Sequence, residues 1–116
     1  MMTSGFNAAA LLEEYGDRGL VRDLAELVVT TTSLQLDKIQ AAVAAGDAQS
    51  LRTAAHCLRG SIAAFGVPSA VEAAKKLEAM GAAGELSGAE PLTEQLAQDI
   101  SALRDGAKAW LASGAV

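Results

Sequence analysis

The sequence predicts an all-α fold, an antiparallel four-helix bundle with a short additional N-terminal helix. The composition favours helices, because 51% of the residues are hydrophobic, only 3% are aromatic, and alanine and leucine are abundant. Apolar residues also recur at spacings of three, four and seven, and glycine and proline separate the segments with this spacing. Since 116 residues suit one domain, we expect a single domain over residues 1–116.

The first predicted helix is short. Asn7 is positioned to cap it, because an asparagine side chain accepts hydrogen bonds from the free amides at a helix N-terminus. The helix reaches Tyr15, and Gly16, Asp17 and Gly19 predict a turn directly after it.

The second predicted helix runs from about Leu20 to Ala45 and has one apolar face. The run of Thr30, Thr31 and Thr32 is its weakest part, because β-branched residues lose side-chain freedom in a helix. The residues expected in its buried stripe are Leu20, Leu24, Leu27, Val28, Leu34, Ile39 and Val43.

The third predicted helix contains the one histidine of the chain. Gly46 suits the left-handed residue that ends the preceding helix, and Asp47 can cap the third helix by accepting amide hydrogen bonds. Gly66 is expected to end it. On a helical wheel, its core stripe consists of Leu51, Ala55, Leu58, Ile62 and Phe65.

A proline begins each of the last two predicted helices. Pro68 fits the first turn of a helix that reaches Met80, because proline has no amide proton to lose there. Residues 81–90 are the loosest segment, and Pro91 begins the last helix. The apolar stripe of that helix comprises Leu92, Leu96, Ile100, Leu103, Ala107 and Trp110 or Leu111. Long amphipathic helices joined by short loops bury such stripes most simply as an antiparallel bundle.

His56 points away from the core stripe of its helix. It lies about 140° from Leu51 on the wheel, so we expect the imidazole to face solvent. Gly60 and Ala63 fall on the same side, although a glycine inside a helix lowers its stability by roughly 1 kcal/mol relative to alanine. The gain that offsets this loss is clearance, because a missing side chain lets another macromolecule approach the ring.

The surroundings of His56 are cationic. Arg52 and Arg59 lie within one turn of it, and no acidic residue occurs between Asp47 and Glu72. Guanidinium groups suit phosphate oxygens, and a neutral exposed histidine can act as a nucleophile, so His56 is the expected catalytic residue. The expected phosphate-binding or partner-binding residues are Arg59, Gly60, Arg52 and Ala63.

The bulk properties exclude several classes of function. A net charge of −5 and a pI near 4.7 argue against nucleic-acid binding, which needs many cations. The apolar runs are shorter than the roughly 20 residues that span a bilayer, and the N-terminus lacks the pattern of a signal peptide. Cys57 is the one cysteine, so no internal disulfide is possible. We expect a cytoplasmic monomer with neither membrane nor nucleic acid as partner.

The residues around His56 resemble the signature of the histidine phosphotransfer (HPt) family, His-x-Leu-Lys-Gly-Ser followed by a glycine where the helix ends. The resemblance extends over most of the chain, because HPt domains are about this long and are antiparallel four-helix bundles with an exposed histidine in mid-helix. The matching residues are His56, Leu58, Arg59, Gly60, Ser61 and Gly66.

The resemblance implies a phosphoryl carrier of a multistep His-Asp relay, not an enzyme. His56 would accept the phosphoryl group through Nε2 from one response-regulator receiver aspartate and pass it to another, and a hybrid histidine kinase is a further implied partner. No cofactor is implied for this chain, because Mg²⁺ and its acidic ligands belong to the receiver in this family. No metal site is expected either, since no second histidine or cysteine lies at ligand spacing.

Arg59 departs from the family pattern, and Glu78 and Ser61 have positions that bear on it. Arg59 replaces the more usual lysine, which keeps the positive charge but changes its geometry. Glu78 falls where family members often carry a glutamate or glutamine close to the histidine, so the resemblance implies that Glu78 orients the imidazole through Nδ1. Ser61 points away from His56, so we expect it to pack or to hydrogen-bond locally.

Two other functions stay open. A non-phosphorylated helical adaptor could bind and inhibit a receiver or kinase without using His56. A stand-alone enzyme with His56 as general base is disfavoured, because no acid or nucleophile lies beside it in the sequence.

Overall fold

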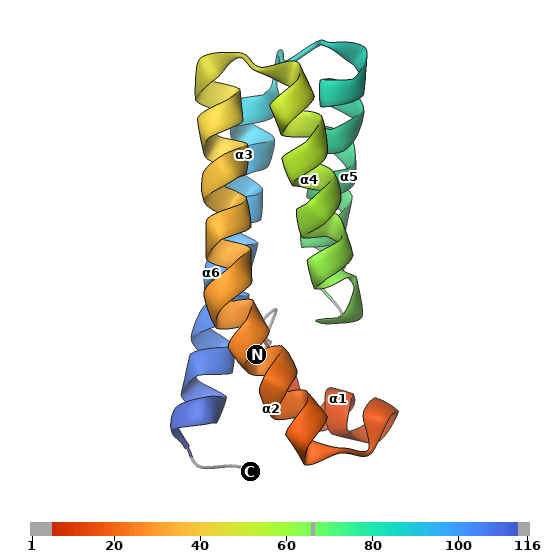
Figure 1. Ribbon diagram of the computed structural model, residues 1–116, viewed down its shortest axis with the longest axis vertical. Coiled ribbons are helices and arrows are strands. Elements are labelled where there is room, and N and C mark those ends of the chain that lie inside the picture. Colours follow the sequence, from red (N-terminus) through yellow and green to blue (C-terminus); the bar gives the residue numbers. More distant parts are fainter. Residues whose placement is uncertain (1–5, 66, 114–116) are drawn as a thin grey trace.

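The computed structural model describes residues 6–65 and 67–113, and all regular structure within them is helical. The elements form an antiparallel bundle with a helical hairpin at one end (Figure 1). They are α1 (Ala8–Tyr15), α2 (Arg18–Leu27), the π-helical turn η1 (Val28–Thr32), α3 (Ser33–Ala45), α4 (Ala48–Ile62), the 3₁₀ turn η2 (Ala63–Phe65), α5 (Pro68–Ala83) and α6 (Ala89–Ala112). The predicted all-α bundle with a short N-terminal helix is confirmed.

The predicted caps are present at the ends of three helices. Asn7 Oδ1 accepts a hydrogen bond from the Ala10 amide at 3.0 Å, and Asp47 Oδ1 accepts one from the Ser50 amide at 3.1 Å. Gly46 ends α3 with a φ of +68°, a left-handed conformation that glycine adopts without steric cost. The chain therefore turns sharply between α3 and α4, which lie side by side in Figure 1.

The turn after α1 is shorter than predicted. Asp17 Oδ1 accepts a hydrogen bond from the Leu20 amide, so Asp17 caps α2 and Gly19 lies inside the helix. The predicted end of the third helix at Gly66 lies outside the described residues, and before it the α-helical geometry of α4 already gives way to η2.

The loop between α5 and α6 is also shorter than predicted, because both helices extend into it. Helix α5 continues past Met80 to Ala83, and α6 begins at Ala89 instead of Pro91. A proline at the third helical position is tolerated, because the first amides of a helix have no intrahelical acceptor. Residues 84–88 alone connect the two helices.

The second predicted helix is continuous but contains the π-helical turn η1 at its threonine run. The Thr30 hydroxyl donates to the Glu26 carbonyl at 3.0 Å, and the Thr32 hydroxyl donates to the Val28 carbonyl. Such bonds from threonine compete with the regular helix ladder. A π turn holds more residues than an α turn, so the face that points to the core changes phase here.

The buried stripe predicted for this segment is wrong at three leucines. Leu20, Leu27 and Leu34 are 39%, 46% and 63% exposed. Smaller residues take several of the core positions, and they let the helices approach closely while the longer leucines lie at the flank. The buried residues here are Val21, Ala25, Val28, Thr32, Ile39 and Ala42.

The predicted stripes of the later helices are confirmed at most positions. The core residues expected on and after α4 are all buried, namely Leu51, Ala55, Leu58, Ile62 and Phe65. On α6, Leu96, Ile100, Leu103 and Ala107 are buried, and Leu92, Trp110 and Leu111 are half-buried. In the described part of the chain, no helix combines the length and the apolar character needed to cross a membrane.

Helices α4 and α5 approach each other backbone to backbone at Gly81. A Cβ atom on Gly81 would lie 2.6 Å from the amide nitrogen of Arg52 and 2.7 Å from the carbonyl oxygen of Ala48. This contact helps to set the register of the two helices. Glu78 lies one turn before Gly81 and is thereby brought beside the exposed face of α4.

Candidate functional site

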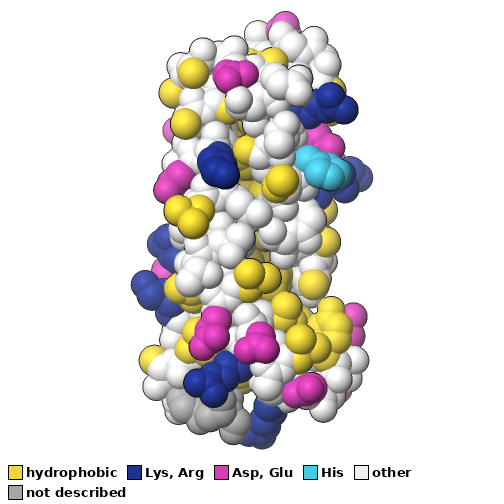
Figure 2. All heavy atoms as spheres, viewed as in Figure 1, with side chains coloured by type: hydrophobic (Ala, Val, Ile, Leu, Met, Phe, Trp, Pro, Cys, Tyr) yellow, Lys and Arg dark blue, Asp and Glu magenta, His cyan; other side chains and the backbone are white. Residues whose placement is uncertain are grey.

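His56 projects from the middle of α4. Its side chain is 64% exposed, and Figure 2 shows the single histidine standing on the surface of the bundle. Its neighbours Ala55 and Leu58 are buried. The phase of the helix therefore places the imidazole outside the core, as predicted.

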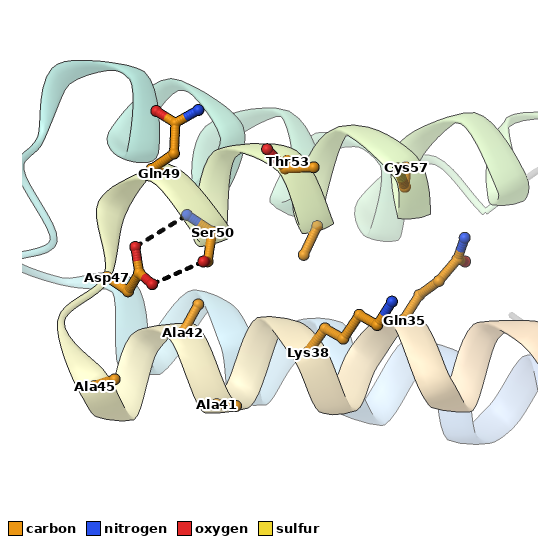
Figure 3. A pocket seen from close by; sticks show the side chains of 11 residues that line it. Gln35, Lys38, Ala41, Ala42, Ala45, Asp47, Gln49, Ser50, Thr53 and Cys57 are labelled. Carbon is orange, nitrogen blue, oxygen red and sulfur yellow. Dashed lines mark hydrogen bonds between the residues drawn. The ribbon is translucent and has the colours of Figure 1, made fainter.

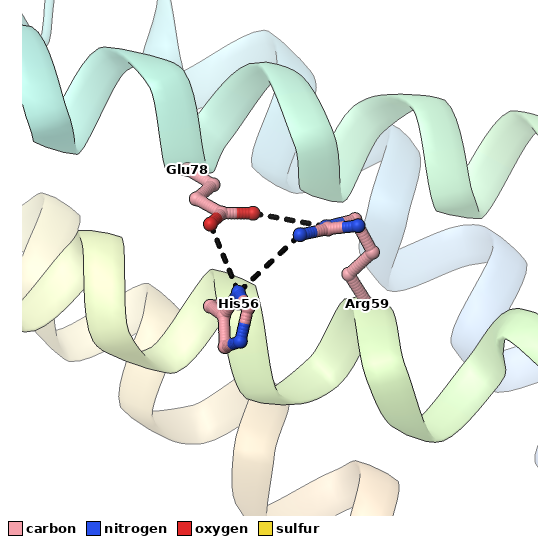
Figure 4. A network of polar contacts seen from close by, with 3 residues as sticks. All are labelled: His56, Arg59 and Glu78. Atoms are coloured by element: carbon pink, nitrogen blue, oxygen red, sulfur yellow. Dashed lines mark hydrogen bonds and ion pairs between the residues drawn. The ribbon is translucent and has the colours of Figure 1, made fainter.

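One nitrogen of the imidazole is held and the other is free. Nδ1 lies 2.9 Å from Oε2 of Glu78 on α5 (Figure 4). A carboxylate can only accept hydrogen bonds, so Nδ1 carries the proton and donates it. The neutral ring then has its lone pair on Nε2, which has no hydrogen-bond partner within residues 6–65 and 67–113. The contact expected between Glu78 and Nδ1 is present.

Arg59 binds the other oxygen of Glu78. Its Nε donates to Oε1 at 2.9 Å, while its Nη2 lies 3.3 Å from Nδ1 of His56. Because Nδ1 already donates its proton to Glu78, it cannot accept a hydrogen bond from Arg59. The Arg59 guanidinium therefore places its positive charge beside the ring without a hydrogen bond to Nδ1.

The hydrogen bond from Arg59 lowers the pKa of the Glu78 carboxyl below its usual value. The hydrogen bond from His56 acts in the same direction, and partial burial opposes both. Glu78 is therefore a carboxylate at neutral pH. That is the form which accepts the proton of Nδ1.

The remaining predicted site residues are Arg52, Gly60 and Ala63, and all three are exposed. Arg52 is exposed one turn before His56 and makes no ion pair with the described residues. A Cβ atom on Gly60 would meet nothing within 4 Å, so the predicted clearance is present. Ala63 is exposed but belongs to η2, so its place on an α-helical wheel does not apply.

An open apolar groove lies between α3 and α4, with a volume of about 630 Å³ (Figure 3). Cys57, which follows His56 in the chain, lines it, and Gln35 and Lys38 extend from α3 at the same end. The rest of the lining consists of Ala41, Ala42, Ala45 and Ala54 together with Asp47, Gln49, Ser50 and Thr53. Sequence reasoning missed this groove, because it depends on how α3 and α4 align. The alanine-rich stretch at residues 41–45 is its one sequence signal.

Ser61, near the site, has a local role. The Ser61 hydroxyl donates to the carbonyl oxygen of Cys57 at 3.2 Å, which confirms the expected local hydrogen bond. Within the described ranges, no group of three or more histidine, cysteine, aspartate or glutamate residues is placed to hold a metal ion.

Comparison with known proteins identifies the family. The family model described as the Hpt domain matches residues 23–106. The crystal structure of histidine-containing phosphotransfer protein B (HptB) from Pseudomonas aeruginosa PAO1 is similar, with 29% sequence identity, a TM-score of 0.77 and coverage of 92% of this chain and 94% of that chain. A search of curated proteins finds no significant match. The resemblance seen in the sequence is confirmed, and the chain belongs to the Hpt family, the histidine phosphotransfer proteins of phosphorelays.

Proposed function

We propose that His56 carries the phosphoryl group in a multistep His-Asp relay. It accepts the group from the receiver aspartate of one response regulator and passes it to a second receiver. The observation that supports this role is the state of the imidazole, whose Nδ1 is held by Glu78 while Nε2 faces solvent. A ring held in this way presents a nucleophile in a fixed direction.

The transfer is a displacement at phosphorus. The Nε2 lone pair of neutral His56 attacks the phosphorus atom of the aspartyl phosphate, and the N–P bond forms as the bond from phosphorus to the aspartate oxygen breaks. The aspartate leaves as a carboxylate. Nδ1 keeps its proton, so the phosphorylated ring is a cation, which Glu78 stabilises at 2.9 Å. The same steps in reverse deliver the group to the second receiver.

The surroundings of His56 support the docking of a receiver domain. Gly60 leaves space beside the ring, and Arg52 is an exposed cation without an ion-pair partner in the described ranges. The groove between α3 and α4 adds apolar contact area next to Cys57. A modest docking surface suits partners that bind and separate repeatedly. As the family resemblance implies, Mg²⁺ and its acidic ligands would belong to the receiver. A cytoplasmic location and a monomeric state stay predictions.

Phosphoryl transfer from a labelled receiver tests the proposal. Incubation with a ³²P-labelled receiver should label the chain in an acid-labile, base-stable form, as expected of a phosphoramidate. His56→Gln should remove the label without changing the circular dichroism spectrum, because the side chain is exposed. Lys108→Ala, an exposed substitution on α6, should keep the label.

The label also separates the alternatives. Label that persists in His56→Gln would contradict the proposed site. Binding of the receiver without labelling of the wild-type chain would indicate the inhibitory adaptor instead.

A further inference from the structure

Arg59 lies deeper in the surface than the histidine beside it. Its side chain is 35% exposed, and its partner Glu78 is 24% exposed, whereas His56 is 64% exposed. A guanidinium that mainly binds the phosphate of a partner would extend into solvent. Arg52 is exposed in this way. The position of Arg59 indicates instead that it serves the carboxylate behind the ring.

The two oxygens of Glu78 have separate partners. Oε2 accepts the proton of His56 Nδ1, and Oε1 accepts the proton of Arg59 Nε, each at 2.9 Å. A carboxylate is planar, so a bond that fixes one oxygen also limits where the other can lie. His56 and Arg59 both come from α4 and Glu78 comes from α5, so the three side chains form a closed triangle across the two helices (Figure 4).

The Arg59–Glu78 pair is not needed to hold the two helices together. Surface ion pairs contribute a median of about 0–1 kcal/mol to stability, and α4 and α5 already meet backbone to backbone at Gly81. The consequence of the pair is local. Without Arg59, the Glu78 side chain could turn into solvent, and Nδ1 would lose a fixed acceptor.

We infer, on the basis of the function proposed above, that Arg59 is a positioning residue that acts on His56 through Glu78. It holds the carboxylate so that Oε2 accepts the Nδ1 proton, which keeps the lone pair on Nε2 where the phosphoryl group arrives. This differs from the role expected from sequence, in which Arg59 contacts phosphate. Arg52 is then the neighbouring cation available to an incoming anion.

The protonation of the two ring nitrogens reports this positioning directly. The chain has one histidine, so ¹⁵N spectra of histidine-labelled protein show a single ring, and they can be recorded at about pH 8.5, where an ordinary imidazole is neutral. The wild-type chain should have its proton mainly on Nδ1. Arg59→Ala should shift the proton toward Nε2, and Arg59→Lys should keep most of it on Nδ1, because lysine also donates to Oε1. Arg52→Ala is the matched control, since it removes the same charge without touching Glu78, and it should keep the wild-type tautomer.

Transfer rates test whether the positioning matters for the reaction. Arg59→Ala and Glu78→Ala should each slow transfer from a phosphorylated receiver about tenfold, the effect of losing one hydrogen bond to a charged group. The double variant should also be slowed about tenfold, because Arg59 has nothing to act through once Glu78 is gone. Multiplied effects, near a hundredfold, would show that Arg59 acts independently and would overturn the inference.

Failure of the inference is distinguishable from failure of the proposed function. A wild-type tautomer in Arg59→Ala, with normal labelling of the wild-type chain, would overturn the positioning role alone. A shifted tautomer with an unchanged transfer rate would overturn it as well. A wild-type chain that takes no label from any receiver would instead refute the proposed function, and the tautomer measurement does not depend on that result.

Discussion

Gly60 and Gly81 lie inside the facing helices α4 and α5, and they lack a side chain for opposite reasons. Each lowers the intrinsic stability of its helix by about 1 kcal/mol relative to alanine. A Cβ atom on Gly60 would meet nothing within 4 Å, whereas one on Gly81 would lie 2.6 Å from the Arg52 amide nitrogen. Gly81 therefore makes room for the chain's own backbone. Gly60 leaves open space beside His56, where we propose that a receiver approaches.

The largest effect should come from filling Gly81. Gly81→Ala should lower the free energy of unfolding by about 2 kcal/mol, because the methyl group can be accommodated only if α4 and α5 move apart. Chemical denaturation followed by circular dichroism measures the change. An unchanged or higher stability would show that the close approach of the two helices is not needed.

Filling Gly60 with a long side chain should affect transfer instead of folding. Gly60→Gln should slow phosphoryl transfer roughly tenfold or more, because the added side chain lies where the partner approaches His56. Its denaturation midpoint should equal or slightly exceed that of the wild-type chain, since glutamine has the higher helix propensity. Unchanged transfer rates in this variant would contradict the clearance that we assign to Gly60.

A smaller and opposite effect on stability is expected from Gly60→Ala. The methyl group enters open space, so the free energy of unfolding should rise by about 0.5–1 kcal/mol. The same substitution thus stabilises at Gly60 and destabilises at Gly81, and the two variants are controls for each other in one denaturation series. If alanine changed the free energy of unfolding in the same direction at both positions, the proposed difference between the two glycines would be wrong.

The sequence predicted the helix caps and the outward direction of His56, because both depend on a few neighbouring residues. Asn7, Gly46 and Asp47 act within one turn, and the phase of α4 follows from its leucines. Contacts between helices are different. That Arg59 and Glu78, 19 residues apart in sequence, would share a hydrogen bond depends on the register of α4 and α5, which no local pattern determines.

Two of the wrong sequence predictions share a physical cause, which is close packing of small residues. Gly81 begins the segment predicted to be the loosest, residues 81–90, yet α5 continues through it where the α4 backbone is nearest. The exposed Leu34 and the buried Thr32 show the same effect at the π turn. In an alanine-rich bundle, hydrophobicity alone does not tell which residue faces a close neighbour.

The smallest expected effect is a change of stability with pH. It distinguishes the charged contact of Glu78 from the steric contact of Gly81. The pKa of Glu78 is lower in the folded chain than its usual value of 4.5, chiefly through Arg59. A lowered folded-state pKa means that the ionised carboxylate stabilises the fold above about pH 4.5, and that this contribution is lost as the pH falls through the folded-state value. The stability difference between the wild-type chain and Glu78→Gln should therefore shrink on acidification. The difference caused by Gly81→Ala is steric and should not change over the same range, so an acid-insensitive difference for Glu78→Gln would show that the carboxylate on α5 holds His56 and Arg59 without its charge.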